Sequence, residues 1–180
     1  MNKKLAVMKN NKGFTLIELV IYALLLVVIG VVSVSFFVQV VNVSEASRRS
    51  REALDNAKRS LDVITQEVRH ASAVYTPTSV FDTSSGQLSL ETTRDLPADE
   101  NATYVDLYVD DSRLFIKREG QVDQIVTSEK VKVTELTFSL LDSSSVKPAV
   151  KIELTVEYAD PILGPKNSIT LTSTATLRSY

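Results

Sequence analysis

The sequence predicts an α+β fold, in which a long N-terminal helix forms the spine of a head built on an antiparallel β-sheet. Three observations lead to this prediction. A run of 26 residues from Leu19 to Ser44 carries no formal charge, apolar residues then recur every three or four positions, and from about residue 87 they recur every second position. The chain is expected to divide into 1–13, a short leader; 14–41, a transmembrane helix; 42–72, the amphipathic second half of the spine; and 73–180, a β-rich globular head.

The N-terminal end has the composition of a membrane anchor preceded by a basic leader. Residues 1–13 contain four lysines and no acid. As a helix, the uncharged run reaches about 39 Å, which is enough to cross a bilayer. A buried core helix is one alternative, but a chain of 180 residues could not surround a helix that is apolar on every side. A cleaved secretory signal would need a shorter apolar run. Basic residues flank the segment on both sides, so charge alone does not decide its orientation.

One acid, Glu18, stands at the edge of this apolar segment. A carboxylate deep in a bilayer costs roughly 2.5–3.5 kcal/mol on insertion scales. Glu18 therefore needs either a partner or a proton. The sequence places no cation beside it.

The residues around Glu18 combine several specific features. Lys12-Gly13-Phe14-Thr15-Leu16-Ile17-Glu18-Leu19-Val20 contains a basic leader, a Gly-Phe pair, a Glu five residues after the Gly and the start of a long apolar helix. The segment resembles the processing and methylation signature of type IV pilins and of the pseudopilins of type II secretion systems. The resemblance implies that a prepilin peptidase cuts between Gly13 and Phe14, and that the new Phe14 amine is N-methylated. It also implies that Glu18 takes part in subunit assembly by pairing with the N-terminal amine of a neighbouring subunit.

This pairing agrees with the electrostatics. Two unit charges about 4 Å apart attract by roughly 4 kcal/mol at an effective dielectric of about 20, which is comparable with the insertion penalty. The resemblance further implies a single-pass cytoplasmic membrane protein with an extracytoplasmic head, which becomes part of a surface or periplasmic filament. The implied partners are the prepilin peptidase, other pilin or pseudopilin subunits, an inner-membrane assembly platform and, before assembly, membrane lipid.

Two departures from the family pattern favour a minor subunit. Ser35 stands where many major pilins carry a helix-breaking proline, and no cysteine pair is present to staple a C-terminal loop. A spine ending in the stretch 62–71, followed by a large β-rich head, resembles the larger minor pilins and pseudopilins. The alternative from another class is a stationary membrane-anchored binding or adhesion module that never enters a filament.

The helical pattern continues beyond the apolar segment. One face is apolar and the others are mostly charged, as expected for a helix laid on a sheet. A coiled-coil dimer is the rival interpretation, but about three heptads give only a short seam. We expect one helix from Thr15 to Ser72, ended by the region around Pro77. The predicted apolar face consists of Leu54, Ala57, Leu61, Ile64, Val68 and Ala71.

The head shows the alternation of β-strands. A hairpin is predicted from 105–109 to 114–116 across a turn at Asp111-Ser112. Further strands are expected at 150–158 and 169–177, the last with a threonine-lined outer face. The apolar phase slips by one between Val133 and Leu136, which predicts a bulge or a break. The expected loops are 95–101, 142–147 and 160–167.

The sequence offers no set of catalytic residues. Without cysteine, disulfides, thiolate metal sites and thiol nucleophiles are excluded. The single histidine, His70, is expected at the surface, and no Gly-x-Ser-x-Gly turn supplies a nucleophile for it. The acids Asp95, Asp99 and Glu100, and the pair Asp110-Asp111, are expected to be solvated turns, because their spacing matches no calcium loop. We therefore expect no enzymatic activity, cofactor or metal.

Charge argues against a head that binds nucleic acid. Without its leader the chain keeps 16 basic and 22 acidic residues, so a basic DNA-binding surface is not expected. The cluster of Arg48, Arg49 and Arg51 is the exception. Anionic lipid headgroups or acids of a neighbouring subunit are its expected partners.

Overall fold

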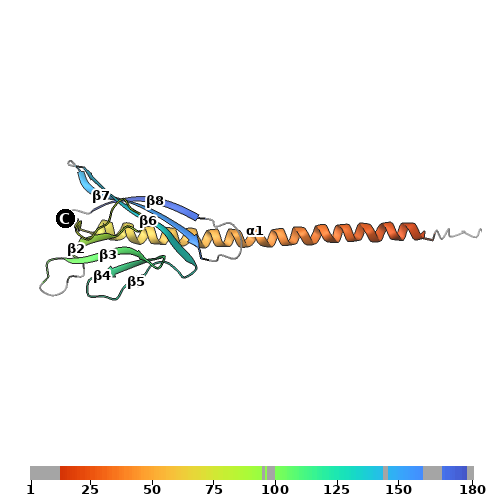
Figure 1. Ribbon diagram of the computed structural model, residues 1–180, viewed down its shortest axis with the longest axis horizontal. Helices are drawn as coiled ribbons and strands as arrows, with labels where there is room; N and C mark the ends of the chain where they lie inside the picture. Colours follow the sequence, from red (N-terminus) through yellow and green to blue (C-terminus); the bar gives the residue numbers. More distant parts are fainter. Residues whose placement is uncertain (1–12, 95, 97–99, 144–145, 160–167, 178–180) are drawn as a thin grey trace, which may run out of the picture. The chain divides into compact units, whose positions relative to one another are not determined.

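The structure is a computed structural model that describes residues 13–94, 96, 100–143, 146–159 and 168–177. The chain divides into two compact units, Met1–Glu45 and Ala46–Tyr180. A single helix, α1 (Leu16–His70), runs from the first unit into the second. The strands all belong to the second unit (Figure 1). They are β1 (Ala73–Val74), β2 (Leu88–Thr92), β3 (Thr103–Asp110), β4 (Arg113–Arg118), β5 (Gln124–Ile125), β6 (Val131–Ser143), β7 (Val146–Tyr158) and β8 (Ser168–Thr176).

Helix α1 confirms the predicted spine to within one or two residues at each end. Thr15 caps its start, because the Thr15 hydroxyl accepts a hydrogen bond of 3.4 Å from the Glu18 backbone N–H. Its last turn carries Arg69 and His70, the charge type that favours the negative end of a helix dipole. Within the first unit the helix is long and apolar enough to cross a membrane, with a mean hydropathy of 2.8 over its most apolar 18 residues.

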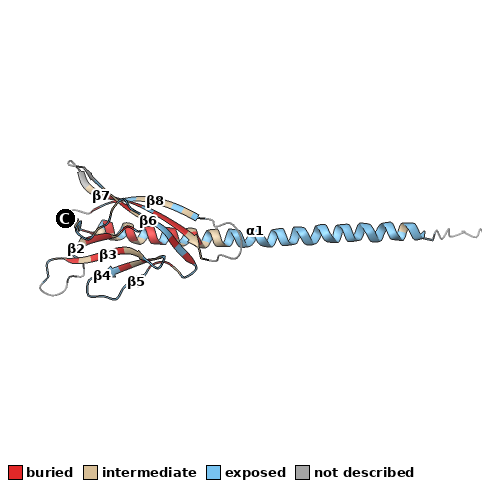
Figure 2. Ribbon diagram, viewed as in Figure 1, coloured by how far each residue is buried: buried red, intermediate tan, exposed pale blue. Residues whose placement is uncertain are grey.

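Burial changes sharply along α1 (Figure 2). None of the described residues in the first unit is buried, whereas one face of α1 in the second unit is covered. This face confirms the predicted stripe, with one correction: Leu54 is only partly buried, and Ala53 is fully buried instead. The covered arc is wider than predicted because strands of both sheets pack against the helix. Its buried residues are Ala53, Ala57, Ser60, Leu61, Ile64 and Val68.

The first sheet has the strand order β1-β2-β3-β4-β5 and is antiparallel throughout. The predicted hairpin is confirmed as β3 and β4, with Leu107 opposite Ile116. Asp111 and Ser112 form the turn, and both have positive φ values, 44° and 59°. This left-handed pair matches the twist of the flanking strands, so the turn is of the type that two-residue hairpins prefer.

The second sheet has the order β6-β7-β8. The predicted strands 150–158 and 169–177 correspond to β7 and β8, and the predicted bulge is confirmed by a register shift between Val133 and Glu135. One expectation needs correction, because 142–147 is not simply a loop: β6 continues to Ser143 and β7 begins at Val146. Backbone pairing, to which polar residues contribute as well as apolar ones, extends the hairpin.

The described residues of the head therefore form two antiparallel sheets, although the sequence suggested one. Both contribute to a single core with the second half of α1, and its largest fully buried side chain is Phe138. The other two predicted loops, 95–101 and 160–167, lie partly or wholly outside the described residues.

Candidate functional site

Phe14, just before α1, and Glu18 and Tyr22, in its first turns, form a group at the start of the helix. Glu18 and Tyr22 are four residues apart, which places them one above the other along the helix. The Tyr22 hydroxyl donates a hydrogen bond of 3.2 Å to Glu18 Oε1. The Phe14 and Tyr22 rings meet edge to face, with centroids 6.1 Å apart and planes at 74°. The three side chains thus form a small cluster around the carboxylate, which we call the Glu18 cluster.

The surroundings of Glu18 are apolar. Every large hydrophobic side chain from Phe14 to Val43 is exposed, from 44% at Val41 to 83% at Leu16. Glu18 itself is partly covered, unlike its neighbours in the first unit. An apolar surface of this extent needs lipid or other protein to cover it.

The geometry leaves the carboxylate able to bind a further donor. Among the described residues, the Tyr22 hydroxyl is the side-chain partner of Glu18, and no cation lies within ion-pair distance. A carboxylate can accept about four hydrogen bonds, so one neutral donor does not satisfy it. The positive end of the helix dipole favours the charge but does not neutralise it. The cluster can therefore bind an amine or another cation supplied from outside the chain.

Residues 8–35 match a family model described as the prokaryotic N-terminal methylation motif. This match supports a place in the type IV pilin and pseudopilin family. The pilin motif contains the whole Glu18 cluster as well as Gly13. It implies processing by a prepilin peptidase and assembly with other pilins, and it points to a structural subunit rather than an enzyme. No curated protein and no solved structure is significantly similar to the chain.

The pilin motif and the apolar helix are also consistent with a membrane-anchored protein that has an extracellular head. The predicted cleavage site lies where a protease could reach it. Gly13 and Phe14 are both exposed and precede the first residue of α1. A Cβ atom added at Gly13 would have no described neighbour within 4 Å. Residues 1–12, most of the predicted leader, lie outside the described part of the chain.

Tyr22 is the member of the cluster that sequence reasoning missed. The signal was present, because a hydroxyl four residues after a carboxylate on a helix lies within hydrogen-bond reach. The signal is weak, because a tyrosine within a long apolar segment is most simply interpreted as one more apolar residue, and a carboxylate is expected to pair with a cation.

The remaining candidates lie in the second unit. His70 is half-buried rather than simply at the surface, and its Nδ1 is buried without a hydrogen-bond partner among the described residues. Arg48 and Arg51 are exposed, and Arg49 is partly covered. In the described part of the chain no three acidic or histidine side chains come close enough to hold a metal ion. Asp95 and Asp99 lie outside that part.

Proposed function

We propose that the protein is a structural subunit, and a minor one, of a type IV pilus-like or type II secretion pseudopilus filament. Prepilin peptidase cleaves it between Gly13 and Phe14, and the Phe14 amine is then N-methylated. The observation that carries this proposal is the position of the methylation motif, residues 8–35, over the uncovered apolar part of α1, in which Glu18 is the single acid up to Ser44.

Before assembly, lipid covers the apolar half of α1 and Tyr22 is the partner of Glu18. In the filament, apolar helices of other subunits replace the lipid. The Phe14 amine of a neighbouring subunit then binds the carboxylate, and an ion pair in a medium of low dielectric fixes how far one helix slides along the next. The inner-membrane platform extracts the subunit, and the head remains outside the cytoplasmic membrane throughout.

Three features support a minor rather than a major subunit. Ser35 replaces the family's usual proline, α1 continues through this position, and no cysteine pair is present. The Ser33 hydroxyl donates a hydrogen bond of 2.8 Å back to the Ile29 carbonyl. This polar side chain therefore has a partner within the continuous helix.

The test is the intact mass and N-terminal sequence of the protein recovered from membranes, with and without prepilin peptidase. The expected product begins at methylated Phe14 only when the peptidase is present. A chain that keeps residues 1–13 in both samples would sink the proposal and favour the stationary anchored module.

A matched pair of variants strengthens this test. Gly13→Ala should block cleavage, because the residue is recognised by the peptidase, whereas the fold does not require glycine there. Gly30→Ala is the control: Gly30 also has no described neighbour within 4 Å of an added Cβ atom. Its product should be cleaved as in the wild type.

A further inference from the structure

The outer edge of β8 differs from the other sheet edges of the head. β1 and β5, at the two ends of the first sheet, contain two residues each. The outer edge of β6 is covered by the chain itself, because the Asp82 and Gly86 N–H groups donate to Phe138 and Leu136 carbonyls, both at 2.8 Å. β8 is nine residues long, and among the described residues no segment pairs with its outer side.

The register identifies the backbone groups at this edge. The Leu177 N–H donates to the Pro148 carbonyl at 3.2 Å, so odd-numbered residues of β8 form their backbone hydrogen bonds with β7. The N–H and C=O groups of the even-numbered residues point away from β7. These residues are Ser168 and four threonines: Thr170, Thr172, Thr174 and Thr176.

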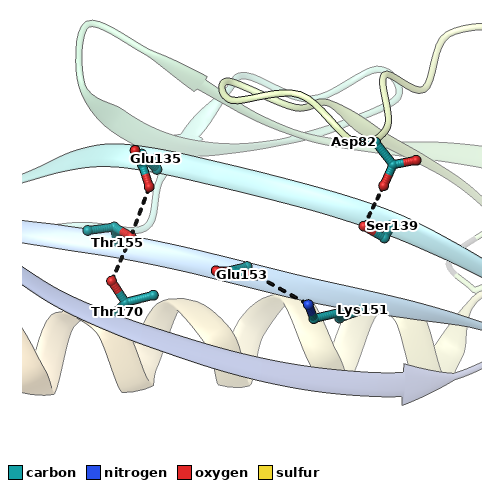
Figure 3. Close-up of polar contacts among 7 residues, drawn as sticks. All are labelled: Asp82, Glu135, Ser139, Lys151, Glu153, Thr155 and Thr170. Carbon is teal, nitrogen blue, oxygen red and sulfur yellow. Dashed lines mark hydrogen bonds and ion pairs between the residues drawn. The ribbon is translucent and has the colours of Figure 1, made fainter.

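This edge lacks the features that usually protect an exposed strand. From Ser168 to Thr176 there is no charge, no proline and no glycine, and the β7–β8 pairing has no register shift. Across the face of the sheet, the Thr155 and Thr170 hydroxyls lie 2.9 Å apart and Thr155 also donates to Glu135 Oε2 at 3.5 Å (Figure 3). A chain of contacts from β6 to β8 thus keeps the edge strand in register.

A groove of about 1070 Å³ runs beside β8, between this strand and the helix face that bears Lys58 and Arg69. Leu61, Leu171 and Leu177 give it apolar surface. Ser173 lies on the same side, with its hydroxyl 3.4 Å from that of Thr65. A strand added to β8 would therefore place every second side chain in this groove.

The charge of the groove indicates which side chains a strand added to β8 would carry. Lys58 and Arg69 line it together with one acid, Asp62. None of the ion pairs among the described residues involves Lys58 or Arg69. The groove is thus basic, whereas the chain as a whole is acidic, at −2. The β8 strand of a second copy is uncharged, so as the added strand it would offer no acid to the two cations.

We propose that the β8 edge binds an extended segment of a different protein, which adds to the sheet as a further strand and carries both apolar and acidic residues on the face that it turns toward the groove. Backbone hydrogen bonds to the outward groups of the four threonines supply the binding, as in other cases of strand addition. The apolar side chains fill the groove and the carboxylates reach Lys58 and Arg69. This interaction surface is separate from the apolar helix and does not depend on filament assembly.

The test uses the full chain in nanodiscs and a fluorescent, end-capped octapeptide, with fluorescence anisotropy as the readout. In this Val-Glu peptide, Val and Glu take turns at every second position and Thr fills the positions between them, so that Val and Glu share one face of the strand. The Val-Glu peptide should bind at least about tenfold more tightly than the matching Val-Lys peptide. N-methylation along one backbone edge of the peptide should abolish binding, whereas N-methylation along the opposite edge should not.

Two variants of the protein locate the site. Thr172→Pro removes an outward N–H while leaving the β7 pairing intact, and should weaken binding by about tenfold. Thr172→Val is its control and should bind as the wild type. The double variant Lys58→Glu with Arg69→Glu, which leaves the strand untouched, should reverse the preference toward the Val-Lys peptide.

Three results would overturn the proposal. One is the absence of Val-Glu binding at millimolar peptide, and another is binding that Thr172→Pro does not change. The third is concentration-dependent self-association that Thr172→Pro abolishes, which would make a second copy the occupant of the edge.

Discussion

The Tyr22 hydroxyl donates to Glu18 Oε1 across 3.2 Å, one helical turn along α1. This contact gives the acid a partner within its own chain, which the proposed subunit would keep before assembly. A neutral hydroxyl supports the carboxylate without neutralising it, so the remaining attraction for an amine is preserved.

Glu18→Ala should leave peptidase cleavage intact and reduce incorporation into filaments by at least about tenfold, because the proposed ion pair, worth roughly 4 kcal/mol, cannot form. Immunoblots of sheared filaments against membranes measure this ratio. Tyr22→Phe is the control, since it removes the same hydrogen bond but keeps the carboxylate, and its incorporation should stay close to that of the wild type. Normal incorporation of the Glu18→Ala protein would contradict the pairing.

Arg118→Ala should destabilise the head by about 1–3 kcal/mol, because it leaves a half-buried carboxylate unpaired. Arg118 Nη2 lies 2.6 Å from Glu67 Oε1, which joins β4 to the helix, and the Glu67 side chain is only 13% exposed. Denaturant unfolding followed by near-ultraviolet circular dichroism measures the change. Adding Glu67→Gln should recover part of the loss. If the effects of the two substitutions on the free energy of unfolding are additive, the ion pair contributes nothing to stability.

Gly86→Ala should cost about 1–3 kcal/mol of head stability through crowding. An added Cβ atom would lie 3.1 Å from the Val80 carbonyl oxygen and 3.2 Å from that of Leu136, and backbone atoms cannot move aside easily. Gly120→Ala is the comparison, because Gly120 has φ of 71° and no described neighbour within 4 Å. Its cost should be about 1 kcal/mol and arise from the backbone alone. Equal melting temperatures for Gly86→Ala and the wild type would show that the 80–87 segment can shift.

Ser60→Ala should raise head stability by about 1 kcal/mol. The Ser60 hydroxyl is fully buried on α1 and has no hydrogen-bond partner among the described residues. Alanine removes this unsatisfied group and is the better helix former. The midpoint of urea unfolding should be higher for Ser60→Ala than for the wild type. A lower midpoint would mean that the hydroxyl does have a partner in solution.

The phenol of Tyr108 should titrate above the usual pKa of 10.0, because partial burial and a hydrogen bond of 2.9 Å to Asp123 Oδ2 both favour its neutral form. Since the pKa is higher in the folded state, the associated stability is present below about pH 10 and is lost as the pH rises through the folded value. In an ultraviolet titration of tyrosinate, the Tyr108→Phe protein should show one fewer tyrosine with a raised pKa than the wild type. Asp123→Asn should lower the Tyr108 pKa only in part, because burial is the larger cause.

The features of the fold that could be predicted are those set by local periodicity. The extent of α1, the β3–β4 hairpin and the bulge after Val133 each follow from spacings within a few residues. The division into two sheets does not, because it depends on which strands pair over long separations. β2 also escaped notice as a separate strand, since it is buried on both faces and shows no alternation.

The candidate site shows the same limit in another form. Gly13, Phe14 and Glu18 came from resemblance to a motif, and their roles stay predictions. Tyr22 was within reach of the helical spacing, whereas the Glu67–Arg118 pair joins residues 51 positions apart and could not have been found from spacing. The uncovered β8 edge could not be predicted either, because it is uncovered only if no other segment of the chain pairs with it.

Every fully buried apolar side chain in the described part of the chain lies between Ala53 and Leu177, inside the second unit. The cooperative unfolding of the head therefore does not involve the apolar half of α1. In a filament of the kind proposed, depolymerisation and denaturation are separate transitions with separate enthalpies. A subunit could return to the membrane with its head intact and be used again in a later round of growth.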